Sequence, residues 1–140
     1  VMSEAEFQYL VLQELQDRDC ALCRDYNLHL KYGSPHPVGQ LASARTQLGF
    51  DDLLGNVWDW LSDDFYALPG FEPHALYDDF SAPYFDDAHS MLLGGCWATT
   101  GTGASRYYRL WFRRHFYQHA GFRLARDWEP RKVVMGTPQV

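Results

Sequence analysis

The clearest periodicity of the chain lies near its beginning. Apolar side chains recur three or four residues apart there, at Phe7, Leu10, Val11 and Leu15. This spacing is typical of one face of a helix. Ser3 and Glu6 precede the run in the order of a capping box, in which each side chain bonds the backbone amide of the other residue. The pattern predicts a helix over residues 4–16.

The hydrophobic pattern is different after about residue 25. Glycines and prolines interrupt residues 33–39, and prolines and paired aspartates alternate with aromatic residues over 61–87, so no helix of useful length fits either stretch. The apolar residues between 50 and 60 are dense but form only a short run. Other short apolar runs predict strands at 91–93, 107–116 and 121–125. The expectation is an α+β domain with functional loops, low in regular structure.

The limits of the domain follow from the same pattern. Residues 1–128 are expected to form the C-terminal part of a domain, whereas residues 129–140 show no periodicity and are interpreted as a linker towards a downstream domain. The beginning at Val1-Met2 favours a piece of a longer protein.

Composition and charge exclude two classes of partner. A net charge of −6 argues against nucleic acid. Residues 88–105 carry no formal charge, but their glycines, threonines and serines exclude a membrane span. Neither Lys nor Arg occurs between Arg45 and Arg106, whereas the chain is basic from Arg106 onward. Either the acidic and basic halves pack together, or they form two solvated faces.

The cysteines and histidines do not form a recognisable metal site. Cys20 and Cys23 form one C-x-x-C pair with no second pair, which favours reduced thiols in the cytoplasm over a zinc site. His115 and His119 have the i, i+4 spacing that two helical zinc ligands use, but no acidic third ligand follows, because residue 121 is glycine. They are predicted to be packing or surface residues.

Five short motifs occur in an order that resembles the sulfatase-modifying-factor family, which includes formylglycine-generating enzyme. They are M-S-E-A-E-F at 2–7, P-V-G at 37–39, L-G-N-V-W-D-W at 54–60, G-G-C-W at 94–97 and G-F-R-L-A at 121–125. The resemblance implies the C-type-lectin-like fold of that enzyme. It does not extend to the oxidase activity, because Thr99 and Ala104 occupy the places of its two reactive cysteines.

Residues 63–85 and 106–114 resemble a different branch of the family, the sulfoxide synthases of ergothioneine and ovothiol biosynthesis. Their details are closer to the ovothiol type, which implies an iron(II)- and oxygen-dependent enzyme that joins cysteine to histidine. The resemblance places the iron in an upstream helical bundle, and a methyltransferase domain downstream is a further expected partner. The alternatives are an ergothioneine-type synthase acting on trimethylhistidine and a non-catalytic binding module of the same fold.

The resemblance also implies site residues. Tyr77 is the expected catalytic residue, because a phenol can pass a proton or hydrogen atom during the reaction. Phe80 belongs to the same motif and is expected to contact substrate. Tyr107, Tyr108 and Arg109 are the other expected substrate contacts, with Arg109 clamping a carboxylate through two hydrogen bonds. If this run is a strand, its side chains alternate between faces and cannot all reach one pocket.

Asn56 and Asp59 fall where this fold often holds calcium. Their side-chain oxygens are suitable calcium ligands. The alternative is that they order the loop around Trp58 through hydrogen bonds to the backbone.

Overall fold

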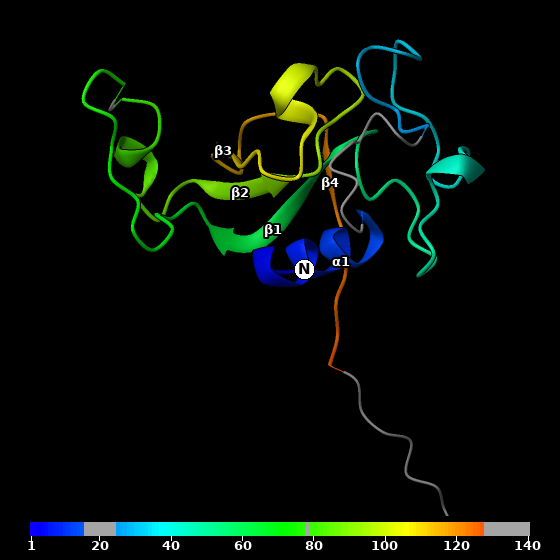
Figure 1. Cartoon of the computed structure of the whole chain (residues 1–140), viewed down its shortest axis with the longest axis horizontal. Coiled ribbons are helices and arrows are strands. Elements are labelled where there is room, and N and C mark those ends of the chain that lie inside the picture. Colours follow the sequence, from blue (N-terminus) through cyan, green and yellow to red (C-terminus); the bar gives the residue numbers. More distant parts are fainter. Residues whose placement is uncertain (16–24, 78, 128–140) are drawn as a thin grey trace, which may run out of the picture.

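The computed structural model describes residues 1–15, 25–77 and 79–127. In these ranges one α-helix, α1 (Glu4–Leu15), lies against a four-stranded sheet (Figure 1). The predicted helix and its capping box are confirmed, since the Ser3 amide donates to Glu6 Oε2 at 2.7 Å and the Glu6 amide donates to Ser3 Oγ at 3.3 Å. None of the helices in the described ranges has the length and apolar character needed to cross a membrane.

The sheet has the strand order β3-β2-β1-β4. Its strands are β1 (Trp58–Asp64), β2 (Ser90–Leu93), β3 (Leu110–Phe112) and β4 (Ala120–Phe122). β1 is antiparallel to β2 and parallel to β4, and β2 is antiparallel to β3. The strand expected at 91–93 is therefore confirmed. The strands expected at 107–116 and 121–125 exist but are each only three residues long.

β1 is the strand that the hydrophobic pattern did not predict. Its sequence contains three aspartates, a residue type that is depleted in strands. Each carboxylate contacts a distant partner: Asp59 accepts from Arg123 at 2.8 Å, Asp63 from the Glu4 amide at 2.6 Å, and Asp64 from Arg114 at 3.4 Å. The pairs with Arg123 and Arg114 confirm that the acidic middle of the chain packs against its basic end.

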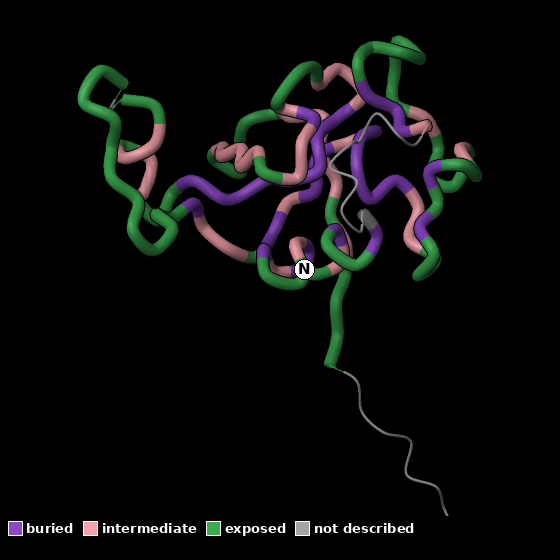
Figure 2. The backbone as a smooth tube through the Cα atoms, viewed as in Figure 1, coloured by how far each residue is buried: buried purple, intermediate pink, exposed green. Residues whose placement is uncertain are grey.

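The core lies on both faces of β2, whose residues are all buried. Met91 and Leu93 belong to the larger cluster, together with Phe7 and Val11 from α1. Leu92 points to the other side, into a cluster with Trp58 and Cys96. In Figure 2 the buried backbone follows β1 and β2 through the centre of the molecule.

Two of the motifs interlock beside this core. Gly55 and Asn56 adopt left-handed backbone at φ of 77° and 62°. The Gly55 amide donates to the Gly94 carbonyl at 2.8 Å, and the Trp97 amide donates to the Asn56 carbonyl at 3.0 Å. A Cβ on Gly55 would lie 2.5 Å from the Asn27 carbonyl oxygen, so only glycine fits without a shift of backbone.

A long connection between β1 and β2, residues 65–89, is called here the β1–β2 loop. It projects from the sheet as the green lobe in Figure 1, and Figure 2 shows that most of it is exposed. The Phe65 amide donates to the His89 carbonyl at 2.7 Å and ties its two ends together. The loop carries Tyr77 and Phe80.

Candidate functional site

An aromatic cluster forms where the β1–β2 loop meets the sheet. Strand pairing sets Trp111 of β3 opposite Met91 of β2, and the Trp111 ring stacks on Tyr84 with centroids 3.6 Å apart. The His89 ring meets Trp111 edge-on at 5.2 Å. Phe80 lies 5.9 Å from Trp111, and Tyr77 stacks on Phe80 at 5.6 Å. The expected site residues Tyr77 and Phe80 are thus brought together at one side of this cluster.

Tyr77 lies on an exposed part of the loop. Its side chain is 61% exposed, and its amide donates to the His74 carbonyl at 2.8 Å. Among the described residues its hydroxyl has no hydrogen-bond partner. The phenol is therefore available to a group that does not belong to the described part of the chain. Its catalytic role stays a prediction.

The run of Tyr107, Tyr108 and Arg109 precedes β3 as a turn at Tyr107 followed by irregular backbone, and it does not extend the strand. Tyr107 is exposed and lies under the guanidinium of Arg106, 4.7 Å from its ring centroid. Tyr108 packs into the smaller core cluster, 6.2 Å from Trp58. Arg109 points towards α1. The structure does not bring these three side chains to one place, so their role as a joint substrate contact stays a prediction.

Arg109 already holds a carboxylate of the protein. Its Nε and Nη2 donate to the two oxygens of Glu4 at 2.8 and 2.9 Å, and its Nη1 donates to the Tyr66 carbonyl at 2.9 Å. The side chains of the ion pair are only 14% and 8% exposed. Hydrogen bonding to Glu4 also raises the pKa of the Tyr66 phenol above its ordinary value. A substrate carboxylate would have to compete with Glu4 for Arg109.

Asn56 has all its side-chain atoms engaged inside the protein. Its Oδ1 accepts from the His36 amide at 2.9 Å and from Asn27 Nδ2 at 3.3 Å, while its Nδ2 donates to the His36 carbonyl at 3.1 Å. These bonds join Asn56 to the backbone of His36 and to Asn27, and they occupy the side-chain oxygen that a calcium ion would need. In the part of the chain that the structure describes, no group of three His, Cys, Asp or Glu is arranged to hold a metal ion.

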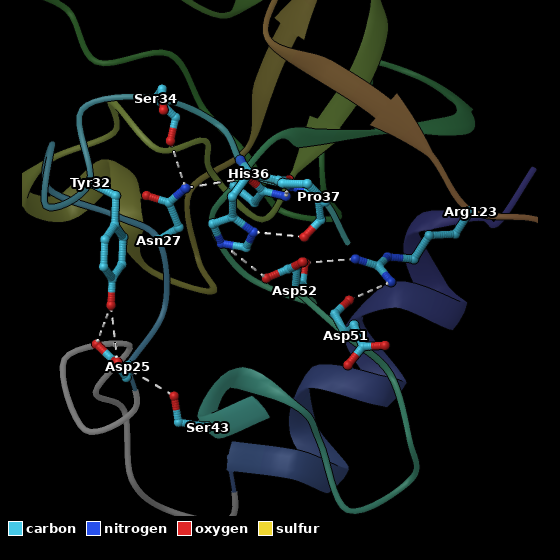
Figure 3. A network of polar contacts seen from close by, with 11 residues as sticks. Asp25, Asn27, Tyr32, Ser34, His36, Pro37, Ser43, Asp51, Asp52 and Arg123 are labelled. Atoms are coloured by element: carbon cyan, nitrogen blue, oxygen red, sulfur yellow. Dashed lines mark hydrogen bonds and ion pairs between the residues drawn. The ribbon is translucent and has the colours of Figure 1, made fainter. Parts of the chain in front are cut away.

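Asp59 pairs with Arg123, which Figure 3 shows at one side of a polar network that also contains His36, Asp51 and Asp52. Arg123 donates from Nε to Asp59 at 2.8 Å and from its other nitrogens to the Asp51 and Asp52 carbonyls at 3.0 and 2.6 Å. Burial raises the pKa of Asp59, although Arg123 acts in the opposite direction. The Asp52 side chain lies 3.8 Å from His36 Nε2, and burial raises its pKa as well. The network binds the loop before β1 to the end of β4.

The histidine pair and Thr99 make packing contacts and hydrogen bonds inside the protein. His115 packs on Phe116 at 4.6 Å, and His119 on Trp97 at 5.4 Å, with no third metal ligand beside them among the described residues. Thr99 donates to Cys96 Sγ at 3.4 Å and accepts from the Cys96 amide at 2.9 Å. The Cys20 and Cys23 pair lies outside the described residues.

The structure also reveals an open cleft of about 540 Å³ that the sequence did not indicate. Asp64, Asp87, Ser90, Arg113 and Arg114 line it, together with neighbouring residues. Three separate segments supply these residues, at Asp64, at 87–90 and at 113–114, and the pairing of β1, β2 and β3 brings the segments together. The only sequence signal was the pair of adjacent arginines, which also fits a solvated surface.

Comparison with known proteins identifies the family. Residues 9–128 match the sulfatase-modifying factor enzyme 1-like domain. Ergothioneine biosynthesis protein 1 of Neurospora crassa is 37% identical over 94 residues, which cover 66% of this chain and 11% of that protein. Hercynine oxygenase of Mycobacterium tuberculosis is 34% identical over 96 residues, which cover 66% of this chain and 22% of that protein. The chain thus spans about a fifth or less of these two curated relatives.

A solved structure supports the fold. Treponema denticola variable protein 1 superposes with a TM-score of 0.65 over 87% of this chain and 45% of its own, at 19% sequence identity. This likeness concerns the fold alone, and with the family match it confirms the α+β, C-type-lectin-like fold expected from the motifs. The chain belongs to the sulfatase-modifying factor family.

Proposed function

We propose that this chain is part of the substrate-binding half of an iron(II)- and oxygen-dependent sulfoxide synthase that joins cysteine to histidine. The observation that carries the proposal is the match of two thirds of the chain to relatives named hercynine oxygenase and ergothioneine biosynthesis protein 1. The aromatic cluster around Trp111 adds a ring-lined surface of the kind that suits an imidazole ring.

Iron fits no set of residues that the structure describes, because no three His, Cys, Asp or Glu side chains converge there. The proposal therefore assigns the iron to an upstream helical bundle and leaves to this chain the binding and orientation of substrate. A downstream methyltransferase domain and a cytoplasmic location complete the proposal. Calcium at Asn56 and Asp59 gains no support from the geometry, since the His36 amide donates to Asn56 Oδ1 and Arg123 donates to Asp59 Oδ2.

Within this chain, Tyr77 is the proposed proton or hydrogen-atom donor, and Phe80 is the proposed support for its ring. Their stacking at 5.6 Å and 17° fixes the plane of the phenol while its hydroxyl stays exposed. Tyr107 and Tyr108 are the proposed contacts to the rest of the substrate. Arg109 is the proposed carboxylate clamp, and in this role it must release Glu4 when the substrate carboxylate binds.

The names of the relatives favour a second candidate, an ergothioneine-type synthase whose imidazole substrate is hercynine, that is, trimethylhistidine. The two candidates differ in the α-ammonium group, which can donate hydrogen bonds in histidine but is fully methylated in hercynine.

The experiment that separates them is a turnover assay of the whole enzyme with iron(II), oxygen and cysteine, supplied with either histidine or hercynine. We expect the histidine–cysteine sulfoxide as the main product by mass spectrometry. A preference for hercynine would establish the second candidate, and no product with either substrate would favour a non-catalytic binding module.

The same assay tests Tyr77. Tyr77→Phe removes one exposed hydroxyl, so the melting temperature and histidine binding should stay unchanged while oxygen is diverted from coupling towards plain cysteine oxidation. Tyr66→Phe, on the same loop but hydrogen-bonded to Glu4, is the matched control and should leave the product ratio as it is. An unchanged product ratio in Tyr77→Phe would return Tyr77 to the role of a surface residue.

A further inference from the structure

We propose that the cleft between Asp64, Asp87, Arg113 and Arg114 binds the α-amino and α-carboxylate groups of a free amino acid, the imidazole substrate of the proposed reaction. This inference rests on the proposed function for the identity of the ligand. The site itself is inferred from the charges, the strand ends and the cavity.

Strand pairing assembles the cleft at one end of the sheet. Asp64 ends β1 opposite Ser90, which begins β2, and Ser90 is in turn opposite Phe112, which ends β3. Arg113 and Arg114 follow Phe112 directly. The pairing between β1 and β2 is irregular between Trp60 and Asp64, as at a bulge, and bulges commonly redirect a side chain beside a functional site.

The floor of the cleft is an ordered set of paired groups. Arg114 Nε donates to Ser90 Oγ at 2.6 Å, and Ser90 Oγ donates to Asp64 at 3.2 Å. Arg114 Nη2 is 3.4 Å from the same Asp64 oxygen. Ser90 is 2% exposed, so this triangle is anchored in the core. It holds Arg114 in place and leaves its Nη1 without a partner among the described residues.

The mouth of the cleft carries one cation and one anion that no other described residue pairs with. In the described part of the chain, neither the Arg113 nor the Asp87 side chain makes a hydrogen bond or ion pair, and both residues are exposed. Each lines the cleft. Arg113 is therefore available to a carboxylate, which a guanidinium binds with two parallel hydrogen bonds, and Asp87 to an ammonium.

A built turn presents Asp87 at this mouth. Asp86 Oδ1 accepts from the amides of Ala88 and His89 at 3.0 and 3.2 Å and contacts His89 Nδ1 at 2.8 Å. The hydrogen bond to His89 lowers the pKa of Asp86 and keeps it ionised. Asp87 next to it adopts left-handed backbone at φ 56°, which is unfavourable for a residue other than glycine.

The charge balance selects the ligand class. Two arginines and two aspartates line the cleft, so their formal charges cancel, unlike a phosphate site, which is strongly basic, or a cation site, which is strongly acidic. A free amino acid carries both charges on one carbon and matches a cation and an anion in one cleft. The aromatic cluster begins next to the cleft. Trp111 lies two residues before Arg113, and His89, which contacts the Trp111 ring, lies directly before Ser90.

The test is calorimetric binding to the whole enzyme in the absence of oxygen, with three probes. Histidine carries both charges, histamine lacks the carboxylate, and imidazole-propionate lacks the ammonium. We expect Arg113→Gln to weaken histidine and imidazole-propionate about tenfold and to leave histamine unchanged. Asp87→Asn should weaken histidine and histamine about tenfold and leave imidazole-propionate unchanged, while asparagine tolerates the left-handed backbone.

Arg126→Gln, which removes an exposed arginine outside the cleft, is the matched control and should leave all three probes unaffected. Unchanged affinities, or equal weakening of all three probes in both cleft variants, would overturn the proposal. The readout is binding and does not require turnover. If each variant weakens only the probes that carry its partner charge, but the whole enzyme makes no sulfoxide, the cleft proposal stands and the proposed function fails. If the enzyme makes the sulfoxide but the variants do not discriminate between the probes, the proposed function stands and the cleft proposal fails.

Discussion

Two consecutive residues, Gly55 and Asn56, determine how the loop before β1 locks onto the turn after β2. Gly55→Ala should be strongly destabilising, because the new Cβ meets the Asn27 carbonyl at 2.5 Å in addition to adopting φ 77°. We expect a loss of about 3 kcal/mol or more in the free energy of unfolding, measured by chemical denaturation.

Gly33→Ala is the matched control, since Gly33 has the similar φ of 71° with nothing within 4 Å of the added Cβ. It should lose only about 1 kcal/mol, the cost of left-handed backbone. Equal losses in the two variants would show that backbone conformation, and not the contact with Asn27, makes glycine necessary at residue 55.

Asp52 gives a prediction about pH. Burial raises the pKa of its carboxyl, so ionised Asp52 opposes folding at neutral pH and its protonation favours the folded state. Asp52→Asn keeps the shape and tolerates the φ of 50°, and should raise the melting temperature at pH 7. The gain should shrink as the pH falls through the raised pKa and vanish below about 4, the pKa of an unfolded aspartate.

Asp51→Asn serves as the comparison, because that carboxylate is more exposed and lies 3.7 Å from Arg45. It should give no gain at pH 7. A melting temperature for Asp52→Asn that stays below that of the native chain at every pH would mean that the contact with His36 outweighs the cost of burial.

The sequence could name individual site residues only where a motif or a family resemblance marked them. Tyr77 and Phe80 were named in this way, and they do lie together. The cleft residues were not named, because Asp64, Ser90 and Arg114 have ordinary surroundings in the chain and become neighbours only through strand pairing. The Glu4–Arg109 pair was also invisible, since nothing local relates two residues at opposite ends of the domain.

At the scale of elements, local signals explain what could be predicted. The helical spacing of apolar residues and the capping box of α1 all lie within about a dozen residues. The helix can therefore be predicted from its own segment of sequence. β1 has no such signal: its aspartates favour a loop, and the partners that make a strand possible come from α1, from β4's end and from the segment after β3. β3 and β4 are shorter than the strands that the sequence predicted. Each pairs with its neighbour over three residues only, and a residue pattern does not show where such pairing ends.

The Glu4–Arg109 ion pair joins the start of α1 to the segment before β3. Arg109→Leu should lower the free energy of unfolding by on the order of 3 kcal/mol, because it leaves the Glu4 carboxylate largely buried without its partner. Combining it with Glu4→Gln should cost less than the sum of the single variants, as expected for residues in contact.

Kinetics of the whole enzyme then decide between the two roles of Arg109. A structural role predicts lower thermal stability with the Michaelis constants of both amino acids nearly unchanged. The clamp predicts a rise of roughly thirtyfold for one amino acid alone, and Arg109→Lys, which keeps the charge but loses the planar fork, should not restore it.

At the scale of the whole molecule, this chain matches only about a fifth or less of the two curated relatives. The 140-residue chain by itself should therefore give no sulfoxide with iron(II), oxygen, cysteine and histidine, since its described residues converge on no iron site. Mass spectrometry of the reaction mixture checks this, with the whole enzyme as the positive control. Steady turnover by the chain alone would overturn the division of labour between an iron-binding bundle and this domain.

The segment before α1 meets the end of β4 at Met2, whose amide donates to the Arg123 carbonyl at 3.1 Å and whose carbonyl accepts from the Ser62 amide at 3.0 Å. On the ribosome, the segment that forms α1 is made well before β4 and Arg123, so this closure waits until they have been made. At roughly 5–20 residues per second, the delay is on the order of ten seconds. During that time the edge of β1 that β4 will cover has no partner, and an open strand edge is a template for aggregation. We therefore expect the nascent segment to be prone to aggregation until β4 covers this edge.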